Sequence, residues 1–249
     1  MLGRDLRWAL DAALWAREAL GFEADPWQAD VLRSGAKRLL MLCSRQAGKS
    51  TVAALAALHA ALYHPGALVL LLSPSLRQSG ELFRRVAGFY RALGDTVPAE
   101  AESALRLELR GGSRIISLPG SEGTVRGYSG VRLLVVDEAA RVEDDLYYSV
   151  RPMLAVSGGR LIALSTPFGK RGWFFHEWAE GQGWERVKVP AAECPRISPA
   201  FLEEERAHLG DWWYRQEYEC EFVEPADKVF GYDQVMRALT PDVKPLFGG

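Results

Sequence analysis

Short apolar runs, separated by polar turns that contain glycine or proline, dominate this chain. The run Leu39–Leu42 ends in such a turn, after which an alanine- and leucine-rich pattern with helical spacing begins at Lys49. Apolar runs over 67–72, 133–136 and 161–164 alternate with further helical patterns, and this alternation predicts an α/β fold with a mostly parallel sheet. The remaining predicted elements are helices over 4–20, 75–93, 173–178, 198–209 and 211–219, a hairpin of strands over 105–109 and 114–118, and a strand over 186–189.

The turn from Ser44 to Gly48 has the chemistry of a phosphate-binding loop. A glycine-containing turn lets successive backbone N–H groups face one anion, and the N-terminus of the following helix adds its dipole. Lys49 can reach the terminal phosphates of a nucleotide, and the Ser50 hydroxyl can hold Mg²⁺. The consensus G-x-x-x-x-G-K-[ST] is met except at its first position, where Cys43 replaces glycine. A chance turn before a surface helix is the alternative.

Two acidic residues follow the fully apolar run Leu133–Val136, which predicts a central parallel strand. Ligands of open α/β sheets bind at the carboxyl ends of such strands. Asp137 would face Mg²⁺ through water, and Glu138 would polarise an attacking water. In a chain that already contains G-K-S, this pair predicts a nucleotide-hydrolysing site.

Other polar groups stand where a nucleotide can reach them. Ser165 and Thr166 follow the apolar run over 161–164, so their hydroxyls can sense a γ-phosphate; a capped turn is the alternative. Upstream, the amide of Gln28 could read the edge of adenine, with Phe22 or Trp27 against the ring. An ordinary helix start with Trp27 in the core explains the same pattern equally well.

Arginines mark two further stretches. The glycine-rich loop over 119–130 contains one arginine, Arg126, and a long loop of this kind in a compact domain is more often functional than decorative. Basic side chains on the helix over 75–93 and in the loop near 170 form either a solvated face or a DNA contact. They are Arg77, Arg84, Arg85, Arg91, Lys170 and Arg171.

Composition narrows the class of protein. The 249 residues, 48% of them hydrophobic, suffice for one α/β domain with a small appendage, and the net charge of −2 means that any nucleic-acid contact must use a local basic patch. The three scattered cysteines suggest neither a disulfide framework nor a zinc site. The amphipathic N-terminus is not a signal peptide, and no apolar run spans a bilayer, so we expect a cytosolic protein. The chain has no Asn and 24 Arg against 6 Lys, which fits a thermophilic source or a GC-rich genome.

Taken together, these motifs resemble the ATPase domain of the terminase large subunit, the viral DNA-packaging motor. The S-R-Q form of the loop is the specific part, because it accommodates Cys43 in place of the first glycine, whereas the Asp-Glu pair is shared with helicases and other ATPases. The matching pieces are Pro26-Trp27-Gln28, Ser44-Arg45-Gln46-Ala47-Gly48-Lys49-Ser50, Val135-Val136-Asp137-Glu138-Ala139-Ala140 and Ser165-Thr166-Pro167.

The resemblance implies a P-loop NTPase core of the additional-strand, catalytic-glutamate type, in which another strand lies between the strands that carry the two Walker motifs. Residues 1–197 would form this core and residues 198–249 a helical lid subdomain with a linker. Large terminases normally carry a nuclease after the ATPase, and we expect that domain to be missing from this chain.

The resemblance also implies the cofactors, ATP and Mg²⁺, and the residues that hold them. The metal would lie at Ser50 and Asp137, and catalysis would use Glu138 with an arginine, either Arg45 in cis or Arg126 in trans. The nucleotide would contact Trp27, Gln28, Ser44, Arg45, Gln46, Ala47, Gly48, Lys49, Ser50, Thr51, Ser165 and Thr166. The implied partners are double-stranded DNA, a portal protein, a small terminase subunit and further copies of the chain in a ring, assembled on a procapsid in the host cytoplasm.

Two other functions fit parts of the sequence. A helicase-like ATPase would share the strand-end motifs, but a second motor domain with its own arginine motif is not visible. A nucleotide-gated binding module would not need Glu138, since a pure switch requires no residue to orient water. A GTP switch is disfavoured because guanine selection by N-K-x-D requires an Asn, which the chain lacks.

Overall fold

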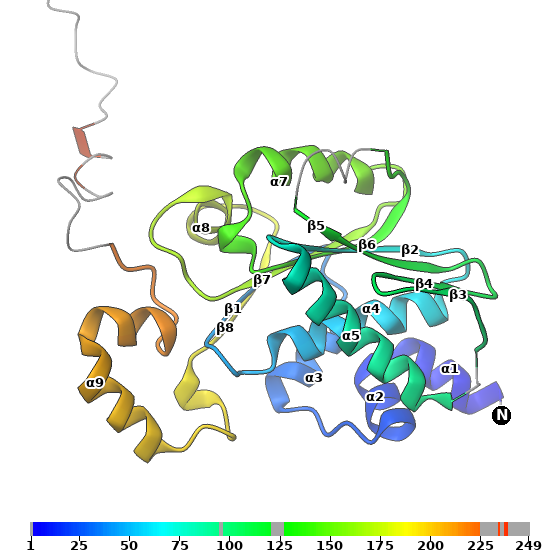
Figure 1. The fold of residues 1–249 in the computed structure, drawn as a ribbon, viewed down its shortest axis with the longest axis horizontal. Coiled ribbons are helices and arrows are strands. Elements are labelled where there is room, and N and C mark those ends of the chain that lie inside the picture. The colour runs from blue at the N-terminus through cyan, green and yellow to red at the C-terminus, as the bar shows by residue number, and fades with distance from the viewer. Residues whose placement is uncertain (1, 95–96, 121–126, 225–233, 235–236, 239–249) are drawn as a thin grey trace, which may run out of the picture.

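The computed structural model describes residues 2–94, 97–120, 127–224, 234 and 237–238. These residues form an eight-stranded sheet with helices on both faces (Figure 1). Its strand order is β3-β4-β5-β2-β6-β7-β1-β8. The strands are β1 (Arg38–Cys43), β2 (Leu68–Ser73), β3 (Ala99–Glu102), β4 (Arg106–Leu109), β5 (Arg114–Pro119), β6 (Val131–Asp137), β7 (Arg160–Ser165) and β8 (Glu185–Val189).

The sheet is mostly parallel, which confirms the predicted fold class. From β5 to β8 all neighbouring strands are parallel, and only β3, β4 and β5 pair antiparallel. The predicted hairpin is the β4–β5 pair. Strand β7 lies between β1 and β6, as the family resemblance implied for the two Walker strands. Strand β3 was not predicted, because its sequence, AEAE, has no apolar face to bury and all four residues are exposed.

Helices lie on both faces of the sheet. In Figure 1, α1 to α5 lie on one side of it, and α7 and α8 on the other. Their bounds are α1 (Leu2–Leu10), α2 (Ala12–Leu20), α3 (Pro26–Arg33), α4 (Lys49–Tyr63), α5 (Leu76–Ala92), α7 (Asp144–Val150), α8 (Gly172–Ala179) and α9 (Pro199–Glu217), with short 3₁₀ turns η2 (Ala139–Arg141), η3 (Arg151–Leu154) and η4 (Ala191–Glu193). Among the described residues no helix is long and apolar enough to cross a membrane.

The prediction of one helix over 4–20 is wrong. Asp11 has an extended backbone, and its Oδ1 accepts a hydrogen bond of 2.9 Å from the Leu14 N–H, so it caps a second helix rather than continuing the first. Near the other end of the chain the predicted break between two helices is present. Gly210 has a φ of 73° and a ψ of 161°, and these non-helical values divide α9 into two arms.

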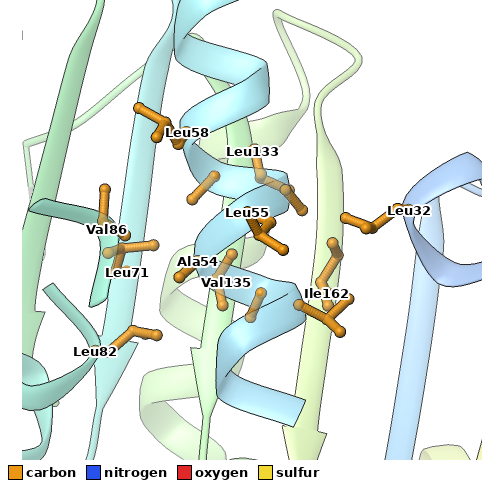
Figure 2. Close-up of a cluster of buried hydrophobic side chains, with 14 of the residues drawn as sticks. Leu32, Ala54, Leu55, Leu58, Leu71, Leu82, Val86, Leu133, Val135 and Ile162 are labelled. Atoms are coloured by element: carbon orange, nitrogen blue, oxygen red, sulfur yellow. The ribbon is translucent and has the colours of Figure 1, made fainter. Parts of the chain in front are cut away.

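Successive side chains of the parallel strands point to opposite faces of the sheet and pack into two hydrophobic cores. In β1, Leu39 and Met41 pack into the core beneath α4, whereas Leu40 and Leu42 pack into the core beneath α7 and α8. Figure 2 shows α4 lying over the strands, with Leu55 close to Val135 of β6 and Ile162 of β7. Helix α4 is therefore a buried helix of the core, and the loop at its N-terminus leads directly into it.

Candidate active site

The sequence-predicted polar residues meet at one edge of the sheet. Strands β1, β6 and β7 are parallel neighbours, so the residues that follow or end them lie together. The Ser50 hydroxyl lies 3.3 Å from Asp137 Oδ2, and Lys49 Nζ lies 3.8 Å from Glu138 Oε1. The Ser165 hydroxyl accepts a hydrogen bond of 3.2 Å from the Ala140 N–H, just past the acidic pair.

The loop from Ser44 to Gly48 is anchored at both ends. The Ser44 N–H donates to the Val189 carbonyl at 3.0 Å, and Gly48 is the N-terminal cap of α4 with a φ of 96°. Gln46 also has a positive φ, of 64°. The φ of Gly48 is one that residues with a side chain rarely adopt, so glycine is favoured there by backbone conformation, and an added Cβ would also lie 2.6 Å from the Gln28 amide nitrogen.

A cavity of about 380 Å³ lies at this loop. It is lined by Gln46 and by residues 48–51, and two arginines from other elements, Arg85 of α5 and Arg196 near η4, complete its wall. Among the described residues that line it, three are cations and none is acidic. The cavity is thus suited to a polyanion, and the helix N-terminus adds to that suitability.

Asp137 lies behind the cavity in surroundings that disfavour its charge. Burial, followed by the charge of Glu138, raises the pKa of Asp137 to about 6, although Lys49, the Glu138 N–H and the Ser50 hydroxyl act in the opposite direction. The Glu138 N–H donates to Asp137 Oδ1 at 2.9 Å. A hydroxyl and a carboxylate side by side are oxygen ligands of the kind that Mg²⁺ prefers, with phosphates and waters supplying the rest. The donor set at Ser50 and Asp137 therefore fits that ion.

Glu138 is held in place by Arg141, which the sequence analysis missed. The Arg141 Nη1 lies 2.8 Å from Glu138 Oε2 and 3.3 Å from the Thr166 hydroxyl, and its guanidinium lies 4.7 Å from the centre of the Phe168 ring. Glu138 itself has a left-handed backbone, with φ 49° and ψ 41°, which is costly for a residue with a side chain. The sequence did contain one indication of this ion pair: Arg141 follows Glu138 by three residues, a spacing at which two side chains can meet.

Only one of the two candidate catalytic arginines, Arg45, belongs to the described residues. The Arg45 Nε forms an ion pair with Glu217 at the last turn of α9. This arginine is not among the residues that line the cavity. Arg126 lies outside the described residues.

The candidate adenine-binding residues lie near the loop but are already engaged. Gln28 is buried, and its Oε1 accepts a hydrogen bond of 2.9 Å from the Asp25 N–H in a capping box at the start of α3. Its amide nitrogen faces Gly48, as described above. Trp27 packs partly buried against the core beneath α4, which is the arrangement of the alternative interpretation.

A parallel sheet in which a glycine turn and Lys-Ser open a buried helix, with Asp-Glu at the end of the strand next but one, defines a P-loop NTPase core of the additional-strand type. The chain belongs to the terminase large-subunit family: residues 40–237 match the family described as terminase large subunit, T4likevirus-type, N-terminal.

Similar proteins come from several phages. The terminase large subunit of Thermus virus P23-45 is 27% identical over an alignment 257 residues long, and the match covers 88% of this chain and 53% of that protein. The corresponding subunit of Escherichia phage T5 is 27% identical over 206 residues, covering 78% of this chain and 46% of that protein. The chain therefore spans about half the length of the curated relatives it matches.

Solved structures share the fold. The large terminase ATPase domain of Thermus phage P74-26 superposes with a TM-score of 0.74 at 23% identity, over 83% of this chain and 97% of that one. The large terminase of a thermophilic bacteriophage, solved in complex with ADP, has a TM-score of 0.61 at 16% identity, over 86% of this chain and 53% of that one.

Proposed function

We propose that this chain is an ATP-hydrolysing motor domain that drives double-stranded DNA into a viral procapsid. The observation that carries the proposal is that Lys49 and Ser50, which line a cavity rich in cations, contact the acidic pair Asp137 and Glu138. Membership of the terminase large-subunit family supports it, as do the structures of the thermophilic bacteriophage's large terminase in complex with ADP and with ATP-γ-S.

The loop and α4 would bind the phosphates. Backbone N–H groups between Arg45 and Ser50 would face the anion, and Lys49 would contact the β- and γ-phosphates. Ser50 and Asp137 would hold Mg²⁺, which neutralises charge that develops on the phosphoryl oxygens. Gln28 and Trp27 would contact the adenine base of the nucleotide. They would do so with atoms that are not engaged in the contacts described above.

Glu138 would orient the attacking water and accept its proton. Arg141 on one oxygen and Lys49 beside the other restrict the carboxylate to a narrow range of positions, and such restriction is what general-base catalysis requires. Thr166 shares the Arg141 guanidinium with Glu138. Thr166 would therefore report the presence of the γ-phosphate to the catalytic carboxylate through Arg141, whereas Ser165 would act through its hydrogen bond with the Ala140 N–H.

The proposal separates binding from hydrolysis. Lys49→Ala should weaken ATP binding, whereas Glu138→Gln should leave binding intact and lower turnover by a factor of about 10² to 10⁴. Glu143→Gln, which changes an exposed carboxylate five residues further on, serves as the matched control. Equilibrium ATP binding and steady-state turnover would be measured for all three variants. Normal turnover in Glu138→Gln would refute the assignment of the catalytic residue.

The catalytic arginine is proposed to be Arg126 of a neighbouring subunit, with Arg45 in cis as the alternative. An arginine on the γ-phosphate is worth about 10³ to 10⁵ in rate. The engagement of Arg45 with Glu217 favours the trans arrangement. The test mixes two inactive proteins, Arg126→Ala and Glu138→Gln, under conditions in which rings form. Mixed interfaces should restore some turnover, and assembled mixtures that stay inactive would return the role to Arg45.

Double-stranded DNA would contact a small basic patch. Arg84 forms an exposed ion pair with Glu81, and Arg171 stacks on Phe168 at 4.4 Å, whereas Arg85 faces the nucleotide cavity. Charge reversal at the pair Arg84 and Arg85, or at Lys170 and Arg171, should weaken duplex binding and flatten its salt dependence, whose slope should correspond to only a few phosphate contacts. Unchanged binding in both would place the patch elsewhere.

The remaining partners follow from the family and are proposals as well. We propose a core of residues 1–197 and a helical lid with a linker over residues 198–249, acting in a ring of subunits. The ring would sit on a portal protein in the host cytoplasm, with a small terminase subunit bound.

A further inference from the structure

Arg196 joins three segments that are distant in sequence. Its Nη2 donates to the Ala47 carbonyl at 2.8 Å, and its Nη1 lies 2.9 Å and 2.8 Å from the two carboxylate oxygens of Asp25. Its Nη2 also lies 3.4 Å from the Cys194 sulfur. One guanidinium therefore contacts the phosphate loop, the start of α3 and the segment that leads into α9.

The contact at Ala47 lies at the most constrained part of the phosphate loop. Ala47 stands between Gln46, with a φ of 64°, and Gly48, with a φ of 96°. The carbonyl and N–H of one trans peptide point in opposite directions, so a cation on the Ala47 carbonyl also fixes the direction of the Gly48 N–H. That N–H belongs to the set that a phosphate loop offers to its ligand.

Both ends of α9 are tied to the same loop. Ser198 caps the N-terminus of α9 two residues after Arg196, and at the other end Glu217 pairs with Arg45. A straight helix of 19 residues would separate its ends by about 28 Å. The break at Gly210 bends α9, as Figure 1 shows, and so allows both ends to face the phosphate loop.

We propose that Arg196 is a positioning residue of the nucleotide cavity, which orients the Ala47–Gly48 peptide and transmits phosphate binding to α9. This inference rests on the proposed nucleotide site. Arg196 lines the cavity, so an anion bound there competes with Asp25 for the guanidinium. Any change in that pairing reaches the cap of α9 through a single intervening residue, Ile197, whose N–H donates to the Cys194 carbonyl at 3.0 Å.

The first test compares Arg196→Ala with Arg33→Ala. Arg33 is a matched control because its Nε pairs with Asp11 at 3.0 Å and its side chain is 51% exposed, against 50% for Arg196, yet it contacts no part of the phosphate loop. Calorimetry with ADP and Mg²⁺ should show binding about ten- to a hundredfold weaker in Arg196→Ala and within about twofold of the parent in Arg33→Ala. Arg196→Lys should fall between them, because an ammonium keeps the charge without the planar fork that bridges Ala47 and Asp25.

Thermal melting of each protein separates positioning from support of the fold. Equal losses of Tm in the two alanine variants, with ADP affinity lost only in Arg196→Ala, are expected. Equal ADP affinities in Arg196→Ala and Arg33→Ala would overturn the proposal. If Arg196→Ala does not fold, Arg196→Lys decides: affinity equal to that of the parent protein would overturn it.

The second test follows the link to α9. At saturating ADP, amide hydrogen exchange over residues 199–217 should slow in the parent protein and remain at its ligand-free rate in Arg196→Ala. Equal slowing in both would overturn the coupling. Failure of the nucleotide site itself looks different: the parent protein would not bind ADP, and Lys49→Ala would be indistinguishable from it.

Discussion

Replacing Asp137 by Asn should make the ligand-free protein more stable at neutral pH. Burial and the neighbouring Glu138 hold the pKa of Asp137 at about 6 in the folded chain, against an ordinary value of 3.8. Ionised Asp137 therefore costs the folded state stability, at about 1.4 kcal/mol per pH unit, or up to about 3 kcal/mol in total. Asn keeps the shape of the side chain and removes the charge. We expect a gain of about 1 to 3 kcal/mol, or about 3 to 10 °C in Tm.

The sign of the pH dependence is specific to a raised carboxyl pKa. Below about pH 4 the group is protonated in both the folded and the unfolded chain, so Asn brings no gain. Between about pH 4 and pH 6 the folded state binds the proton more tightly, and the cost of ionisation grows as the pH rises. Above about pH 6 the full cost is present. The advantage of Asp137→Asn should therefore grow from about pH 4 to about pH 6 and then level off.

The assay is urea unfolding at several pH values without nucleotide or Mg²⁺, with Asp30→Asn as a control on an exposed carboxylate of α3. The control should differ little from the parent at every pH, because an exposed charge remains hydrated. A variant Asp137→Asn that is less stable than the parent at pH 8, or whose gain does not shrink toward pH 4, would refute the electrostatic reasoning. The stabilised variant should at the same time lose Mg²⁺-dependent nucleotide binding, since active sites often retain residues that lower stability.

Three further substitutions test other parts of the site and core. Gly48→Ala should lower ADP affinity at least tenfold by calorimetry, because its φ of 96° is strained for a residue with a side chain, whereas Gly35→Ala, with open space around it, should not; equal affinities would contradict this. Leu55→Ala should lower the free energy of unfolding by about 2 to 5 kcal/mol in urea, because its side chain is fully buried; a loss below about 1 kcal/mol would be inconsistent with that packing. Arg141→Gln should lower turnover about tenfold while ADP affinity stays within twofold, and a loss of affinity instead would place this arginine at the nucleotide.

The strands of the core and the ligand-binding edge of the sheet could be predicted from sequence because their signals are local. The apolar runs that became β1, β6 and β7 each end in polar residues, and parallel strands bring such ends together. The order of the strands could be predicted only from the family resemblance, since the local sequence of β7 does not indicate that this strand lies between β1 and β6. Gly210 was visible as an interruption between two helical patterns.

Features that depend on long-range contacts were missed. Asp11 interrupts an otherwise continuous helical pattern, and its side chain, which caps the next helix at Leu14, is also held by Arg33, 22 residues away. Strand β3 exists because β4 offers it an edge, not because AEAE favours a strand. Arg196 lies in a stretch rich in proline, and its partners Asp25 and Ala47 are 171 and 149 residues away, so sequence spacing carries no trace of it.

The position of β1 in the sheet has a consequence for how the protein is made. Both neighbours of this apolar strand, β7 and β8, are synthesised long after it, and Cys43 pairs with Val189. At roughly 5 to 20 residues per second, a ribosome needs about 7 to 30 seconds to cover that interval. During this time β1 has neither β7 nor β8 to pair with, and its apolar side chains can contact other nascent chains or chaperones. Chains that stop before Val189 should therefore accumulate as aggregates. Two changes can raise the yield of the 249-residue chain: co-expression with a chaperone and slower degradation. We expect the chaperone to have the larger effect.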